Sequence, residues 1–233
     1  IDRFHKNKII LFLKKKLKNI PITVIDVGAH EGETIQIFLR YFNLKKIICY
    51  EASSKNFLKL KKISSKILKK DIIELNNFGI GEKDSILEFN NTLESSSSTF
   101  CKINYDSKYF KRKKRILNFF YNGSYVDKSE LVTIKPLSYE INRYNLKKID
   151  LLKIDTEGYE FNVLKGLSKH NQKIKLVYFE HHYDDMIVKN YKFGDIHQLL
   201  KSFGFVMIKK SKMLFRKSFE YVYENQKMIN NLE

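Results

Sequence analysis

Residues 24–34 read VIDVGAHEGET, and this stretch decides the fold. It begins inside a mostly apolar, β-branched run from Thr23 to Val27, which suits a strand buried in a parallel sheet. A loop with two glycines, Gly28 and Gly32, follows the run and ends it. Apolar residues then recur at helical spacing from 35 to 42, which indicates a helix with one buried face. The stretch therefore predicts a strand, a glycine loop and a helix in succession.

The same alternation continues outward from this unit. Further strand patterns lie at 46–50, 72–80, 86–89, 150–154 and 174–179, with amphipathic helices between several of them, and a closing antiparallel pair is expected at 205–208 and 219–223. Strands that alternate with helices are typical of a parallel sheet covered on both faces. We therefore expect an α/β fold with a mostly parallel, doubly wound sheet and an antiparallel closing pair.

Two further segments complete the expected organisation. Residues 1–21 have the pattern of a basic amphipathic helix that ends at Pro21, and residues 22–233 then form one domain. Within that domain, residues 92–130 contain a serine run and a basic run, and fit no strand or helix of the main pattern. So long an insertion is usually a functional loop, and we expect a lid or substrate insertion there, with a flexible solvated loop as the alternative.

Composition excludes several classes of protein. The formal net charge is +18, but all except six of the 44 basic residues are lysine, and they are dispersed. Nucleic-acid readers favour arginine forks, so nucleic-acid binding stays an alternative rather than the main interpretation. Two cysteines do not support a disulfide scaffold or a structural zinc site. No apolar run approaches the roughly 18 residues that span a bilayer, and we expect a cytoplasmic protein.

The glycine loop and an acidic residue predict an adenosine ligand. In open α/β sheets, ligands bind beyond the carboxyl ends of the strands, where the Gly28–Gly32 loop lies. Glu51 ends the second strand and is placed to accept hydrogen bonds from ribose hydroxyls. Carboxylates in the loop, such as Glu31, would repel a pyrophosphate but suit a sulfonium and an amino group. We therefore expect S-adenosylmethionine, with a nucleotide-cofactor oxidoreductase as the rival.

Several stretches resemble the FkbM-type methyltransferase family. The loop at 24–34 looks like its first motif, the string KIDTEGYE at 153–160 resembles its most diagnostic stretch, and residues 77–81 resemble its third-strand segment. The sequence departs from the family at Ser138, where aspartate is usual, and at His30, which replaces a frequent asparagine. The resemblance implies a Rossmann-like class I fold and methyl transfer, usually to a hydroxyl oxygen of a sugar, glycan or small metabolite.

The expected cofactor contacts follow from these motifs. They are Asp26, Gly28, His30, Glu31, Gly32, Thr34, Glu51, Ala52, Asn77, Phe78, Gly79 and Asp155.

Transfer to an alkyl hydroxyl also needs a base, because the oxygen must lose its proton. Asp155 and Glu157 follow a strand end and are the first candidates, with His181 after the next strand as the third and His182 as its alternative. Adjacent residues of a strand point to opposite faces, so only one of these histidines is expected at the site. Capping of the following helix is a competing role for Asp155. We predict no metal site, although a divalent cation on Asp155, Glu157 and Glu180 remains an alternative.

The insertion offers a route for acceptor binding. Its hydroxyls at Ser95–Thr99 and its aromatic residues, Phe110 and the group at 119–121, are expected to line the cofactor side. The basic run at 111–115 is expected to attract an anionic acceptor.

Overall fold

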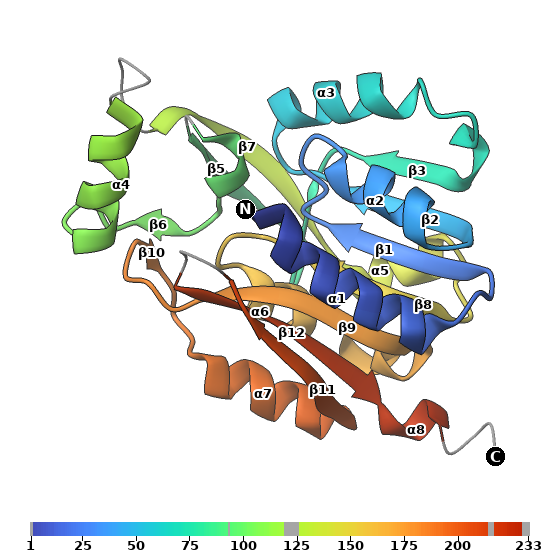
Figure 1. Cartoon of the computed structure of the whole chain (residues 1–233). Helices are drawn as coiled ribbons and strands as arrows, with labels where there is room; N and C mark the ends of the chain where they lie inside the picture. The colour runs from blue at the N-terminus through green and yellow to red at the C-terminus, as the bar shows by residue number, and fades with distance from the viewer. Residues whose placement is uncertain (1, 93, 119–125, 214–216, 230–233) are drawn as a thin grey trace.

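A seven-stranded sheet forms the centre of the computed structural model, which describes residues 2–92, 94–118, 126–213 and 217–229 (Figure 1). The strand order is β3-β2-β1-β8-β9-β12-β11. Its five parallel strands are β1 (Ile22–Val27), β2 (Leu44–Tyr50), β3 (Ile73–Asn76), β8 (Ile149–Ile154) and β9 (Ile174–His182). The pair β11 (Phe205–Lys212) and β12 (Ser218–Asn225) closes the sheet in antiparallel register. The predicted α/β fold with its closing pair is confirmed.

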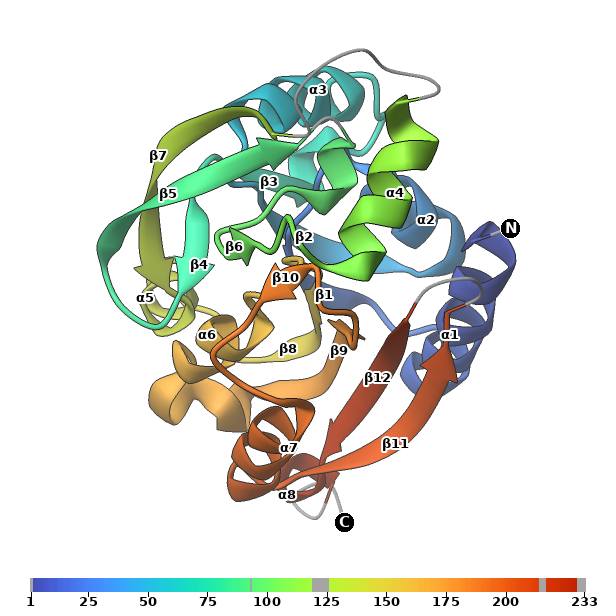
Figure 2. The ribbon, with the colours of Figure 1, turned by 90° about the vertical axis from the view of Figure 1, so that its left-hand side faces the viewer.

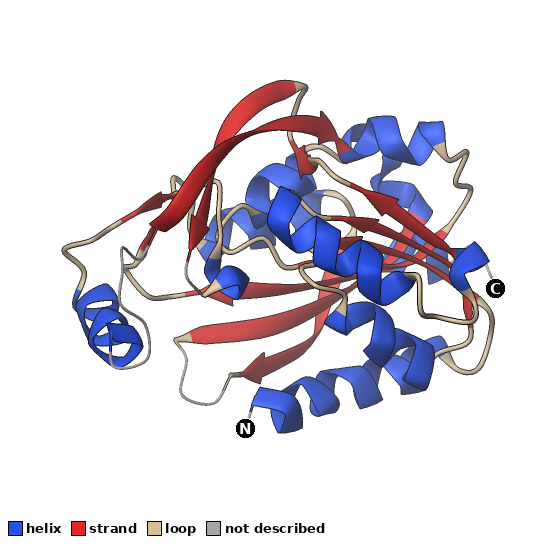
Figure 3. Cartoon of the chain, turned by 90° about the horizontal axis from the view of Figure 1, so that it is seen from above, coloured by secondary structure: helices blue, strands red, loops and turns tan. Residues whose placement is uncertain are grey.

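Helices cover both faces of this sheet, as Figure 3 shows from above. On one face, α1 (Asp2–Leu17), α2 (Glu33–Tyr41) and α3 (Ser54–Ser64) pack in a cluster that includes Leu13, Val24 and Phe38. On the other, α5 (Leu137–Arg143), α6 (Glu160–Lys165) and α7 (Phe193–Ser202) pack around residues such as Ile25. Successive strand residues face opposite sides, so Val24 and Ile25 enter different halves of the core. The short α8 (Gln226–Ile229) follows β12.

The amino-terminal helix is shorter than the sequence suggests. We expected it to reach Pro21, but α1 ends at Leu17, where Lys18 takes a left-handed φ of 55°. Ile9, Leu13 and Leu17 are fully buried, so this helix is part of the core rather than an appendage.

The prediction of one continuous strand over 72–80 is wrong. The chain forms a 3₁₀ turn at Lys70–Ile72, then β3, and it leaves the main sheet at Asn77. The Asn77 side chain donates to the Glu51 carbonyl at 2.9 Å, and this bond secures the turn. Beyond it, β4 (Gly79–Gly81) belongs to a second sheet of order β4-β7-β5, with β5 (Ser85–Thr92) and β7 (Val126–Pro136).

The insertion contains regular secondary structure rather than a plain loop (Figure 2). It contains a 3₁₀ turn, η2 (Ser95–Ser97), the short strand β6 (Lys102–Ile103) and the helix α4 (Lys108–Asn118). Strand β6 pairs with β10 (Ile187–Val188), and Phe110 of α4 packs against Met186 and Ile187. The last residues of the expected insertion, 126–130, belong to β7, a strand that we did not predict from the sequence. The aromatic group expected at 119–121 lies outside the described residues.

Candidate active site

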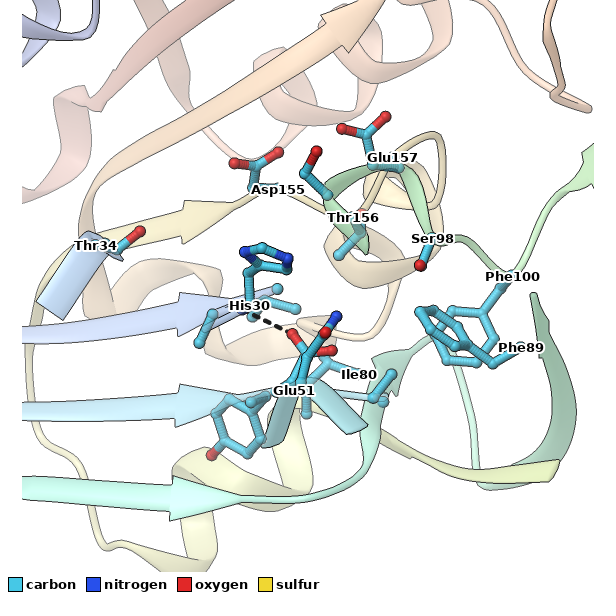
Figure 4. A pocket seen from close by; sticks show the side chains of 18 of the residues that line it. His30, Thr34, Glu51, Ile80, Phe89, Ser98, Phe100, Asp155, Thr156 and Glu157 are labelled. Carbon is cyan, nitrogen blue, oxygen red and sulfur yellow. Dashed lines mark hydrogen bonds between the residues drawn. The ribbon is translucent and has the colours of Figure 1, made fainter. Parts of the chain in front are cut away.

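One pocket lies where the carboxyl ends of β1, β2, β8 and β9 meet (Figure 4). In that view His30 and Glu51 lie near the centre, Asp155 and Glu157 lie above them, and Phe89 and Phe100 lie to the right. The pocket therefore joins the main sheet to the second sheet and to the serine run.

Gly28 forms the floor of the pocket. Its φ is 82°, and a Cβ there would lie 1.9 Å from the Asp155 carbonyl oxygen. The two strand-end loops touch closely, since the Asp155 N–H donates to the Val27 carbonyl at 2.9 Å. Only glycine combines the left-handed backbone with this contact.

His30 links the glycine loop to three neighbours. Its backbone N–H donates to Glu51 Oε2 at 2.7 Å, its Nδ1 lies 3.1 Å from Glu33 Oε1, and its Nε2 lies 2.8 Å from Ser95 Oγ. Its φ of 50° is unusual outside glycine, and such strain concentrates at functional sites. The histidine thus connects the loop, the second strand and the serine run.

Glu51 is buried at the end of β2 and fits the role of a hydroxyl acceptor. Its Oε1 accepts from the Ser53 N–H at 2.9 Å, while Oε2 accepts from His30. Each carboxylate oxygen has a second lone pair, so both can accept from a ligand as well. Burial raises the pKa of Glu51 to about 7, against the two backbone hydrogen bonds that lower it.

Beside Glu51, aromatic and aliphatic side chains form an apolar wall. The rings of Tyr50 and Phe78 are 5.4 Å apart, and those of Phe89 and Phe100 are 4.7 Å apart. Ile80 completes the wall from β4. A flat purine ring would find apolar contacts here next to the carboxylate, so the pocket fits an adenosine group.

A buried ion pair that we did not predict from the sequence lies next to the loop. Lys153 Nζ is 2.9 Å from Asp26 Oδ1 and 3.5 Å from Asp155 Oδ2. Burial opposes the charge, yet the two carboxylates raise the pKa of Lys153. The signal for this pair was a lysine inside an otherwise apolar strand, because such a charge needs a buried partner.

Glu157 is a buried carboxylate that lies beside a histidine. It is buried, its φ is 49°, and its Oε2 lies 3.3 Å from His182 Nε2. Burial raises the pKa of Glu157 to about 7, although the His182 cation lowers it. A carboxylate with a pKa near neutral pH suits a general base.

The turn that presents Glu157 is tied down from three directions. Thr99 Oγ1 donates to the Glu157 carbonyl at 2.7 Å, and Tyr191 Oη donates to the Gly158 carbonyl at 3.1 Å. The Gly158 N–H donates to Glu160 Oε1 at 2.9 Å. These bonds hold the strained backbone of Glu157, which lines the pocket.

His181 does not line the pocket, in contrast to our expectation. Its ring centroid lies 4.8 Å from that of Tyr183 and 5.7 Å from that of Phe193, within an aromatic cluster under α7. Burial lowers the pKa of His181 to about 3. Its neighbour His182 contacts Glu157 instead, because successive residues of β9 face opposite sides.

The other expected contacts divide into two groups. Eight line the pocket: Gly28, His30, Thr34, Glu51, Ala52, Phe78, Gly79 and Asp155. Four are not among the lining residues: Asp26 pairs with Lys153, Glu31 pairs with Lys59, Gly32 is the N-cap of α2, and Asn77 donates to the Glu51 carbonyl. Ser95, Ser96 and Ser98 also line the pocket. Among the described residues, no three or more His, Cys, Asp or Glu side chains are grouped to hold a metal ion.

The fold and the pocket define a Rossmann-like methyltransferase of class I. This chain belongs to the FkbM methyltransferase family, since the family model for the methyltransferase FkbM domain matches residues 26–207. The match confirms the predicted family. The predicted cofactor, S-adenosylmethionine, is bound in a solved methyltransferase that has the same fold. No curated protein matches the chain. In the described part of the chain, no helix is both long and apolar enough to cross a membrane.

Solved structures with the same fold are distant in sequence. The FkbM methyltransferase of Methylobacillus flagellatus KT is 13% identical with a TM-score of 0.57, over 88% of this chain and 43% of that one. The magnesium protoporphyrin IX methyltransferase of Synechocystis PCC 6803, solved with bound S-adenosylmethionine, is 10% identical with a TM-score of 0.53, over 94% and 77%. The METTL16 methyltransferase domain is 8% identical with a TM-score of 0.54, over 94% and 67%. The chain thus spans less than half the length of the Methylobacillus protein.

Proposed function

We propose that this chain transfers a methyl group from S-adenosylmethionine to a hydroxyl oxygen of a sugar, glycan or small metabolite. One observation carries the proposal: the carboxylate of Glu157 is buried at the same pocket as Asp155 and the Gly28 loop, with a pKa near 7. Transfer to a hydroxyl needs a group that accepts its proton, whereas transfer to a thiolate or a free amine needs less help.

The chain's own residues divide the work of binding. Glu51 would accept from the ribose hydroxyls, the wall of Phe78 and Ile80 would contact the adenine, and the Gly28 loop with Asp155 would hold the methionine end. When bound, the cofactor supplies an electrophilic methyl group on a sulfonium. Serine hydroxyls of the η2 turn cover the same pocket and are available to orient an acceptor. Holding the two reactants in line accounts for much of the rate of such a displacement.

Glu51→Ala should weaken cofactor binding at least tenfold, because it removes two charge-assisted hydrogen bonds, each worth about 1.5–3 kcal/mol before solvent compensates. The Glu51 pKa of about 7 adds a pH signature. Hydroxyl donors prefer the ionised carboxylate, so affinity in the wild type should rise from pH 6 to pH 8. Isothermal titration with S-adenosylmethionine at both pH values measures the two effects.

The matched control is Glu74→Ala, on β3, where the carboxylate is half exposed and pairs with Lys46 on the surface. It should leave both affinity and its pH dependence unchanged. An unchanged affinity in a folded Glu51→Ala variant would remove Glu51 from the cofactor site.

The exposed basic residues of α4 should affect acceptor binding alone. Lys113 Nζ forms an ion pair with Glu94 Oε2 at 2.5 Å. The other four basic residues of the run are exposed: Lys111, Arg112, Lys114 and Arg115. Replacing these four with serine should raise the KM of an anionic acceptor several-fold and leave cofactor affinity unchanged, because the field of a basic helix concentrates anions near it. The control variant loses the same number of positive charges elsewhere, so its net charge equals that of the α4 variant. In it, serine replaces four exposed lysines at and beyond the carboxyl end of α3: Lys61, Lys62, Lys66 and Lys69. An equal KM in both variants would reduce α4 to a structural element.

A screen tests the proposed function as a whole. Labelled S-adenosylmethionine is offered with sugar nucleotides, glycans and small hydroxyl metabolites. Base-stable label separates a methyl ether from a methyl ester, and NMR of the product shows whether the methyl group is on oxygen. Titration with a nicotinamide dinucleotide tests the oxidoreductase alternative. Gel-shift assays at two salt concentrations test nucleic-acid binding, which must weaken steeply as salt rises. If the folded protein binds nucleic acid and methylates no sugar nucleotide, glycan or small metabolite, the proposed acceptor class is wrong.

A further inference from the structure

His182 is surrounded by carboxylates at the carboxyl end of β9. Its Nε2 lies 3.3 Å from Glu157 Oε2 and 3.5 Å from Glu180 Oε1, and its Nδ1 lies 3.6 Å from Asp184 Oδ2. All four side chains are buried. Three carboxylates this close to one ring form an arrangement that favours an imidazolium rather than a neutral imidazole.

The ring is held in place from both sides of the turn after β9. Asp184 Oδ1 accepts from the Met186 N–H at 3.0 Å, which fixes the carboxylate that faces Nδ1. The Lys189 ammonium donates to the His182 carbonyl, which fixes the backbone. His182 is therefore oriented by contacts that do not involve the pocket, and its Nε2 lies within ion-pair distance of Glu157.

We infer that His182 is a positioning residue which, as an imidazolium oriented by Asp184, keeps Glu157 ionised and directed into the pocket. The inference rests on the proposed function, in which Glu157 accepts the acceptor's proton. Without the ring cation, Glu157 would lie in a buried site beside the like charge of Glu180, and its protonated form would be favoured. The imidazolium opposes both burial and that repulsion.

The charges around the pair support this direction. Although burial opposes its charge, the neighbouring carboxylates raise the pKa of His182 to about 10. The charged groups with the main effects on Glu157 are His182, Glu180, Asp155 and Lys113. Those with the main effects on His182 are Glu157, Asp184, Glu180 and Glu160. Lys189 acts on Asp184 and Glu157 from the strand end. Among these groups, His182 lies 3.3 Å from the Glu157 carboxylate.

The first test needs no acceptor. Side-chain nitrogen NMR of the whole chain, recorded from pH 5 to pH 10, reports the charge of His182. In the wild type the ring should stay protonated above pH 8, and in Glu157→Gln its pKa should fall by about one unit, because one facing charge is lost. His181→Gln identifies the neighbouring signal, which should remain neutral across the range. A His182 that titrates near 6.5, or that ignores Glu157→Gln, would overturn the inference.

The second test is the pH profile of methyl transfer with an acceptor from the screen. His182→Gln should shift the acid limb of kcat/KM upward by about one unit or more, since Glu157 then ionises only at higher pH. Activity lost at pH 7 should return as the pH rises, which a merely structural defect would not allow. Asp184→Asn should shift the same limb by less. An equal loss at every pH contradicts the positioning role, whereas failure to find any acceptor bears on the proposed function and leaves the NMR test intact.

Discussion

Glu157→Gln should reduce the turnover of methyl transfer by about 100-fold or more and leave cofactor affinity within about twofold. Glutamine keeps the size of the side chain but cannot accept the proton of an acceptor hydroxyl. The carboxylate is buried beside His182, and a pKa of about 7 makes it partly ionised at neutral pH. Single-turnover kinetics separate the chemical step from binding, and calorimetry measures the cofactor alone.

Two companion variants define the result. Glu82→Gln changes a carboxylate that pairs with Lys165 on the surface and should turn over normally. Asp155→Asn alters a pocket residue that lies 3.5 Å from Lys153, and its main effect should be on cofactor affinity. Near-normal turnover in Glu157→Gln together with a large loss in Asp155→Asn would transfer the role of base to Asp155.

Gly28→Ala should destabilise the protein by about 3 kcal/mol or more and abolish measurable cofactor binding. The added methyl group would lie 1.9 Å from the Asp155 carbonyl oxygen, so the loops after β1 and β8 must separate. The left-handed φ of 82° adds a cost of about 1–2 kcal/mol for any residue with a Cβ. For a chain of this length, the loss corresponds to a fall in Tm of about 6–12 °C.

Gly194→Ala is the matched control. A Cβ at Gly194 meets no atom within 4 Å, and this residue lies in the first turn of α7. Alanine there should leave binding unchanged and keep or slightly raise the Tm. Thermal melts and calorimetry on the two variants decide the matter, and a Gly28→Ala protein as stable as Gly194→Ala would contradict the close approach of the two loops.

The fold was predictable where local pattern and burial agree. The run at 23–27 is mostly apolar and β-branched, and it forms a strand buried on both faces. The break at Asn77 was missed although Asn76, Asn77 and Gly79 disfavour a strand. The apolar residues on both sides of them concealed it, and the turn depends on a hydrogen bond to Glu51, which is distant in sequence. Strand β7 was missed for the same reason, since its pairing with β5 spans the whole insertion.

The site shows the same division. Gly28, Glu51 and Asp155 follow three strands that turn out to be parallel neighbours, so topology alone brings them together. The choice between His181 and His182 depends on the register of β9 against the sheet, and alternation along one strand cannot decide it. Lys153 was passed over because its partner, Asp26, belongs to a different strand.

The left-handed backbone at Glu157 lowers the stability of the fold at a residue that the proposed activity requires. Any residue with a Cβ is strained there, and glycine would relieve the strain while deleting the carboxylate. Selection for heat resistance alone would therefore favour loss of the very group that we expect to do the chemistry. Evolution of this enzyme under thermal pressure must find its gains elsewhere in the fold, because at this position durability and activity are competing traits.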